Sequence, residues 1–225
     1  APTVTITNGG ASSAQDGATR ALTFTLSEAS TDFVVGDITV VNGTLGTLST
    51  TDNIVYTATL TVDNPAAGNV TVDVATPKFT DAAGNDNTAA TQLVITRDNT
   101  APTLSAESAS GATDTTATLN FTSDEAGTYY YLVYASADSA PSAATVEAQG
   151  AAVTKGTAST AATTKTVSVT GLTASTAYKA YVIVKDAAGN KSTVSTITLT
   201  TTAGDTTAPT VTITNGGASS AQDGA

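Results

Sequence analysis

The sequence predicts an all-β chain that consists of two Greek-key β-sandwiches in series, followed by the first strand of a further unit. Three observations lead to this prediction. Apolar residues alternate with Thr and Ser over several short segments, clusters of Gly, Asn, Asp and Pro separate those segments, and part of the chain is repeated. Alternation of period two places one residue type on each face of a half-buried strand. The 225 residues suit two sandwiches of about 100 residues each.

The repeat defines the units. Residues 1–18 recur without a change as residues 208–225, at an offset of 207 residues, which indicates a long unit copied in tandem. Half-way along, the Asp-Asn-Thr-Ala-Pro-Thr run that starts at Asp98 resembles the run that starts at Asp205, and we interpret both as linkers that enter a strand. The predicted units are residues 1–98 and 99–204, with 205–225 forming a linker and the first strand of the next repeat.

Strands are expected where apolar and polar residues alternate most clearly, and turns are expected where Gly, Asn, Asp and Pro cluster. The predicted strands include residues 22–26, 54–62 and 70–74 in the first unit, and 119–121, 167–169, 179–185 and 197–199 in the second. The expected turns include 8–10, 42–43, 63–69 and 189–190. A short helix is expected within 139–150, where Pro141 suits the first turn of a helix.

The composition excludes several classes of function. With no Cys and no His, the chain has no thiolate nucleophile, imidazole base or disulfide. A glycosidase built on two carboxylates needs neither residue, but the acids here fall in turns, and we predict that the protein is not an enzyme. A net charge of -11 leaves no basic patch for nucleic acids or anionic membranes. The sequence also lacks a run of about 18 apolar residues, so direct membrane insertion is not expected.

Two segments resemble known families. In the second unit, the run Thr-Gly-Leu-Thr-Ala-Ser-Thr-Ala-Tyr ends at Tyr178 and precedes Asp-Ala-Ala-Gly-Asn at 186–190. It resembles the corner between strands E and F of fibronectin type III domains, where a tyrosine hydroxyl bonds to upstream backbone. The first unit, with Phe-Thr-Leu-Ser-Glu at 24–28 and Phe-Thr-Asp-Ala-Ala-Gly-Asn at 79–85, resembles the bacterial immunoglobulin-like repeats of giant adhesins.

The second resemblance implies a location and a role. Such repeats are stacked in bacterial surface proteins, usually with calcium between them, and carry a distal binding domain away from the cell. The resemblance therefore implies two immunoglobulin-like sandwiches, of which the second is similar to fibronectin type III. It also implies that they form an extracellular stalk or extender, and that their partners are neighbouring repeats of the same polypeptide. Two alternatives stay open. One is self-association into filaments or a surface layer, and the other is an accessory carbohydrate-binding module that uses the tyrosines at 129–131.

Acidic residues are expected to meet at one pole of each sandwich. If seven strands run alternately, the incoming linker and the loops after the second and sixth strands share that pole. Each acid alone suits a turn, but crowded carboxylates repel unless a cation neutralises them, and Ca²⁺ prefers oxygen ligands. The candidate calcium ligands are Asp98, Asp124, Glu125 and Asp186 in the second unit, Glu28, Asp81 and Asp86 in the first, and Asp205 in the last linker.

Overall fold

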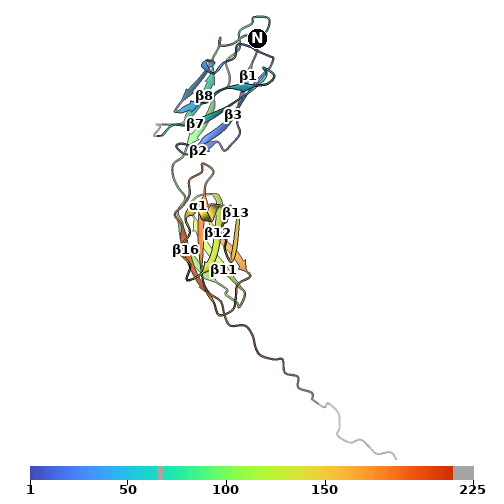
Figure 1. Ribbon diagram of the computed structural model, residues 1–225, viewed down its shortest axis with the longest axis vertical. Helices are drawn as coiled ribbons and strands as arrows, with labels where there is room; N and C mark the ends of the chain where they lie inside the picture. Colours follow the sequence, from blue (N-terminus) through green and yellow to red (C-terminus); the bar gives the residue numbers. More distant parts are fainter. Residues whose placement is uncertain (65–67, 215–225) are drawn as a thin grey trace, which may run out of the picture.

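The computed structural model describes residues 1–64 and 68–214. Apart from one short α-helix and one short 3-10 helix, the regular elements within these residues are strands. The strands form two sandwiches placed end to end, and the chain after the last strand extends away from the second sandwich (Figure 1). The predicted all-β fold class is confirmed.

The first sandwich has two sheets around one apolar core. One sheet has the order β1-β3-β7-β5, with β6 also paired to β7, and the other has the order β2-β9-β8-β4. The pairs are antiparallel except β2 with β9, which is parallel. The strands are β1 (Val4–Asn8), β2 (Ser13–Ala14), β3 (Thr19–Leu26), β4 (Ile38–Val41), β5 (Gly43–Leu45), β6 (Ser49–Thr50), β7 (Val55–Val62), β8 (Val70–Val74) and β9 (Leu93–Arg97), and the 3-10 helix η1 (Val35–Asp37) precedes β4.

Strict alternation builds the core of the first sandwich. Along β7, every second residue from Tyr56 to Val62 is buried while the residues between them face solvent. Four aromatic rings fill one end of this core. The ring of Phe33, in the loop after β3, has its centroid 6.0 Å from Phe24, 5.1 Å from Tyr56 and 5.0 Å from Phe79. These contacts hold that loop against the sheets.

The second sandwich packs a three-stranded sheet, β10-β11-β14, against a four-stranded sheet, β13-β12-β15-β16. All of its strand pairs are antiparallel. Its core is separate from that of the first sandwich and includes Leu119, Phe121, Val169 and Val182. The strands are β10 (Leu104–Ser110), β11 (Thr116–Ser123), β12 (Gly127–Ala135), β13 (Thr154–Thr160), β14 (Thr164–Thr170), β15 (Ala177–Lys185) and β16 (Ser195–Thr200).

Two local predictions in the second sandwich are confirmed. The buried hydroxyl oxygen of Tyr178 accepts a hydrogen bond from the backbone N–H of Thr173 at 2.8 Å, which makes the expected corner. The helix α1 (Ala143–Glu147) lies within the range expected for it and is capped by Ser142, whose hydroxyl accepts from Thr145 N–H at 3.2 Å. This helix packs Val146 on the outer face of β12 and β15.

Residues 208–214, the described part of the repeated segment, carry no strand. Their counterparts 1–7 contain the start of β1, which is paired with β3. Among the described strands, none pairs with residues 208–214. The remaining residues of the expected strand, 215–225, lie outside the described residues.

Candidate metal site at the junction of the sandwiches

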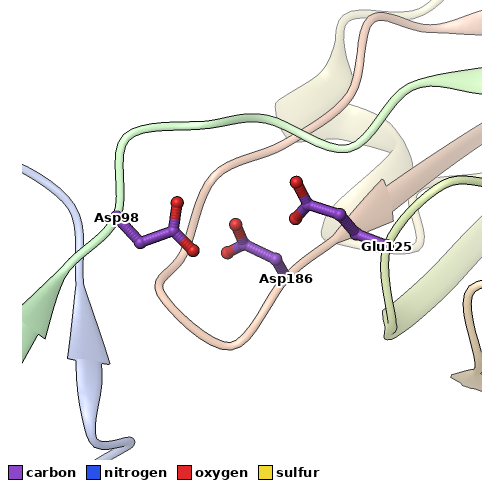
Figure 2. Close-up of side chains that lie close together, drawn as sticks. All are labelled: Asp98, Glu125 and Asp186. Carbon is purple, nitrogen blue, oxygen red and sulfur yellow. The ribbon is translucent and has the colours of Figure 1, made fainter.

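Three carboxylates meet where the two sandwiches join (Figure 2). Asp98 follows β9 in the linker, Glu125 lies in the turn between β11 and β12, and Asp186 begins the loop after β15. One oxygen from each carboxylate lies within 4.8 Å of the others. Two oxygens bound to the same Ca²⁺ at about 2.4 Å are at most about 4.8 Å apart, so the spacing fits one hard cation.

Asp186 is held by the loop that it begins. Its Oδ1 accepts hydrogen bonds from the backbone N–H groups of Gly189 at 2.7 Å and Asn190 at 2.8 Å, and its Oδ2 accepts from Asn190 Nδ2 at 2.8 Å. Gly189 has φ +111°, a conformation that suits glycine. The carboxylate is therefore buried and fixed in direction by hydrogen bonds from its own loop.

Asp98 fastens the linker to both sandwiches. Its N–H donates to Ala14 O at 3.0 Å in the first sandwich. Its backbone carbonyl accepts from Asn190 Nδ2 at 2.9 Å in the second. Its side-chain Oδ1 accepts from Thr100 N–H at 3.0 Å. These bonds position the carboxylate over the loop that contains Asp186.

Glu125 completes the group and is its least satisfied member. Within the described residues, its carboxylate accepts no hydrogen bond, while its backbone bonds to Ser123. Partial burial, followed by the negative charges of Asp98, Asp186 and Asp124, raises the pKa of Glu125. A bound cation would reverse the effect of these neighbours, because it favours the ionised form.

The basic residues adjacent to the group in sequence are engaged elsewhere. Arg97 forms a two-pronged ion pair with Asp16 in the first sandwich. Lys185 bonds to Glu147 of α1 at 2.7 Å, and Lys191 pairs with the other oxygen of the same carboxylate. Within the described part of the chain, none of the three acids forms an ion pair; the charge of Asp186 acts on Lys185 only as the last of the causes that raise the pKa of that lysine. The carboxylate oxygens of the three acids suit a hard divalent ion.

The raised pKa of Glu125 predicts a pH dependence of stability. Since the pKa is higher in the folded state than its ordinary value of 4.5, this residue favours folding most below that value, and its contribution is lost as the pH rises through the raised pKa. With EDTA present, the free energy of unfolding of the wild-type second sandwich is expected to fall, relative to Glu125→Gln, as the pH rises above 4.5. Urea titrations at a series of pH values measure the difference, and parallel curves for the two proteins would contradict it.

Asp124, also expected at this pole, points elsewhere. Its Oδ1 accepts from the N–H of Thr103 at 2.7 Å, and its Oδ2 accepts from the hydroxyl of the same residue at 2.5 Å. These bonds lower the pKa of Asp124. It therefore fixes the start of the second sandwich to the turn that carries Glu125, and it adds negative charge beside the group without joining it.

The first sandwich contains a partial copy of the arrangement. Asp81 accepts from the N–H groups of Ala83 and Asn85 and from Asn85 Nδ2. The two bonds from the asparagine recur in the other Asp-Ala-Ala-Gly-Asn loop, where Asn190 makes them to Asp186. Glu28 occupies the position of Glu125 in its turn, and both Glu28 and Asp86 are exposed. Among the described residues, these three acids do not gather into a three-carboxylate group.

Asp205 repeats the local structure of Asp98. Its Oδ1 accepts from the N–H of Thr207 at 2.7 Å, as Asp98 does from the residue two positions later. Its side chain is exposed, and no other acid of the described chain forms a metal-like group with it.

Sequence reasoning missed the direct contacts of the junction. The N–H of Gln15 donates to Ala188 O at 3.4 Å, and the N–H of Asp16 donates to Asn99 Oδ1 at 2.8 Å. Both join segments far apart in sequence.

The tyrosines proposed as a sugar platform are largely covered. Tyr129 and Tyr131 are buried in the main core of the second sandwich, and Tyr130 is half-buried against the cluster under α1. Of the tyrosines on β12, Tyr130 and Tyr134 are only partly exposed, and both pack against the cluster under α1. The described residues include no helix with the length and apolar character that a membrane crossing requires.

Comparison with known proteins finds one family model that is similar to the first part of the chain. Residues 1–96 match the family model described as a bacterial Ig-like domain. The first sandwich is similar to a bacterial Ig-like domain, and it is named the Ig-like domain for this similarity. The two sheets of this Ig-like domain, β1-β3-β7-β5 and β2-β9-β8-β4, correspond to the ABED and CFG sheets of immunoglobulin folds, with β2 added beside β9. No curated protein matches the chain.

Several solved structures of tandem domains are similar to the chain that carries this Ig-like domain. A titin segment has 14% identity and a TM-score of 0.42, with 90% of this chain and 67% of that chain covered. The FN1-FN3 domains of chicken CNTN1 have 18% identity and a TM-score of 0.38, with 89% and 68% covered. A segment of two fibronectin type III domains from chicken tenascin has 12% identity and a TM-score of 0.33, with 87% and 97% covered.

Proposed function

We propose that the chain is a stalk or extender repeat of a bacterial cell-surface or secreted adhesin, stiffened by calcium at its domain junctions. The observation that carries the proposal is the group formed by Asp98, Glu125 and Asp186, because it joins the linker to two loops of the following sandwich. The bacterial Ig-like domain and the identical segments 207 residues apart support a structural repeat. A chain without His or Cys favours this role over catalysis.

The junction already restricts motion between the sandwiches. Domains joined by small interfaces are expected to move relative to one another. Here Gln15 contacts the loop 186–190, and Asn190 binds the backbone of Asp98. These few bonds do not remove the repulsion between Glu125 and the acids around it. A cation that neutralises these carboxylates would hold the linker and both loops together.

The donor set suits calcium. Ca²⁺ takes six to eight oxygen ligands, and three carboxylates supply between three and six of them, with water able to complete the shell. Asp186 and Asp98 are held by backbone hydrogen bonds, so part of the site is formed before the ion binds. Calcium sites in extracellular modules bind at about 0.1–1 mM, and the stalk would be stiff where calcium is plentiful.

Calcium binding is expected to stabilise the second sandwich. It is also expected to restrict the range of orientations that the second sandwich adopts relative to the first. At 10 mM Ca²⁺, a dissociation constant of about 0.1–1 mM corresponds to about 1.4–2.7 kcal/mol. The melting temperature of the second sandwich is then expected to be higher than in EDTA by on the order of 5–15 °C. Calorimetry measures this shift, and small-angle scattering measures the spread of molecular dimensions.

Two variants make the test specific. Glu125→Gln removes one ligand charge and is expected to abolish most of the calcium response. It is also expected to stabilise the second sandwich in EDTA, because the repulsion is removed. Glu28→Gln changes the matching turn of the Ig-like domain, where the described residues form no such group, and should respond like the wild type. A wild-type protein with equal melting and equal dimensions in calcium and EDTA would rule the proposal out.

A further inference from the structure

Residues 14–16 of the Ig-like domain meet the linker and the second sandwich. Each of these successive residues gives one backbone group to the contact. The hydrogen bonds join Ala14 O to Asp98 N–H at 3.0 Å, Gln15 N–H to Ala188 O at 3.4 Å, and Asp16 N–H to Asn99 Oδ1 at 2.8 Å. The segment therefore lies between the start of the linker and the loop that carries Asp186.

The side chain of Gln15 packs against that loop at Gly189. A Cβ atom added to Gly189 would lie 3.4 Å from Nε2 of Gln15 and 3.6 Å from its Cδ. The N–H of Gly189 in turn donates to the Asp186 carboxylate at 2.7 Å. A shift of residues 14–16 would therefore reach the loop that fixes the direction of Asp186.

Strand β2 alone does not hold residues 15 and 16. Its pairing with β9 ends at Ala14 and Arg97, so these two residues lie beyond the strand. The ion pair between Asp16 and Arg97 extends the hold, because the guanidinium Nε and Nη2 donate to the two carboxylate oxygens. The side chains of Arg97 and Asp16 are only 15% and 17% exposed. A two-pronged pair of this kind fixes direction as well as distance.

The same ion pair acts on the linker. Arg97 ends β9 and directly precedes Asp98, whose carbonyl accepts from Asn190 Nδ2 at 2.9 Å. One guanidinium thus connects the residue before Asp98 to the segment that packs on the loop of Asp186. The position of one carboxylate relative to the other depends on both connections.

We propose that Asp16 is a positioning residue for the three carboxylates at the junction. Through its ion pair with Arg97, it sets the spacing between the linker and the loop that begins at Asp186. Asp16 is not itself one of the three grouped acids. Its effect on calcium binding rests on the proposed function, whereas the spacing of the two sandwiches is set without an ion.

Arg97→Gln separates positioning from charge. By charge alone, loss of a positive side chain next to Asp98 would tighten the binding of a divalent cation to the three carboxylates. Loss of positioning weakens the binding instead. The calcium dissociation constant of the whole chain is expected to rise by about fivefold or more, and calorimetric titration with CaCl₂ measures it.

Asp16→Asn tests the other half of the pair, and Asp63→Asn is its matched control. Both remove one negative charge from the same end of the Ig-like domain, since Gly17 N–H donates to the carbonyl of the residue before Asp63 at 3.0 Å. Asp63 is exposed, and its carboxylate accepts from the hydroxyl of Thr44 at 3.2 Å. Asp16→Asn is expected to weaken calcium binding as Arg97→Gln does. Asp63→Asn is expected to change the dissociation constant by less than about twofold, because exposed charges are screened.

A distance measurement in EDTA tests the spacing without an ion. The chain has no Cys, so Thr59→Cys and Thr196→Cys place one spin label on each sandwich, at exposed positions of β7 and β16. Pulsed electron paramagnetic resonance then reports the distribution of distances between the labels. The distribution is expected to be broader in Asp16→Asn and Arg97→Gln than in Asp63→Asn, which should match the labelled chain without further changes.

Broader distances together with weaker calcium binding in both variants of the ion pair support the positioning role. Unchanged distances, or a calcium affinity that stays the same or rises in Arg97→Gln, would overturn it. If the wild type binds no calcium, the proposed function fails, and the distances in EDTA alone decide whether the ion pair sets the spacing. Arg97→Lys keeps the charge but not the planar fork. It replaces Arg97→Gln if that variant does not fold, and it is expected to broaden the distances in the same direction.

Discussion

Replacing Phe33 with alanine is expected to lower the melting temperature of the Ig-like domain by more than about 10 °C and to leave the second sandwich almost unchanged. Phe33 is 3% exposed, and its ring contacts Phe24, Tyr56 and Phe79. Losing a buried phenylalanine costs about 3–5 kcal/mol, since the cavity adds to the lost transfer energy. Calorimetry of the whole chain should show one transition that moves and one that does not.

The two sandwiches are expected to unfold in separate thermal transitions because their hydrophobic cores are separate. The buried cluster of the Ig-like domain ends at Ile95, and that of the second sandwich begins at Ala117. Phe121→Ala provides the mirror experiment, in which the other transition should move. If either variant shifted both transitions equally, the hydrogen bonds of the junction would be coupling the sandwiches into one cooperative unit.

The strands with strong alternation could be predicted from the sequence, and the mostly exposed edge strand β10 could not. β7 and β8 follow period two almost throughout, because one face packs and the other is solvated. By contrast, β10 is mostly exposed and carries a bulge between Ser105 and Ser108. Backbone pairing alone holds much of such a strand, so its side chains show little pattern.

One residue shows where alternation misleads. Ile54 continues the apolar series of β7 and was expected to lie on its buried face, but it is 37% exposed and precedes the strand. The carboxylate of Asp52 accepts from the N–H groups of Ile54 at 3.0 Å and Val55 at 2.8 Å. This turn sets the direction of the chain before the strand begins, so period two cannot be extended backwards through it.

The end of the sandwich at which the candidate site lies could be predicted from the sequence, but the side chains that form the site could not. Strand direction alone brings the linker and two loops together, and Asp98, Glu125 and Asp186 do meet there. The neighbouring acids 124 and 125 could not be separated from the sequence, because neighbours in an extended turn point to opposite sides. In the structure, Asp124 turns to Thr103, and Glu125 faces the other two carboxylates (Figure 2).

The second large effect is expected at Asn87, a buried amide that organises the segment leading to Asp81. Asn87 is 1% exposed. Its Oδ1 accepts from the N–H groups of Lys78 at 2.7 Å and Phe79 at 3.1 Å. Its Nδ2 donates to the carbonyls of residues 75 and 88 at 2.9 and 2.8 Å. One side chain therefore satisfies four backbone groups, which fixes Phe79 in the aromatic core and the loop of Asp81 beyond it.

Asn87→Ala leaves those four groups without partners inside the protein, and the expected loss of stability is about 3–5 kcal/mol. Urea unfolding of the Ig-like domain measures it. Asn85→Ala is the matched control, because Asn85 lies two residues away in the same loop, is exposed, and uses its amide for a single bond to Asp81. A much smaller change is expected there. Equal losses for the two variants would mean that Asn87 acts through the loop of Asp81 alone, and that water replaces its four backbone bonds.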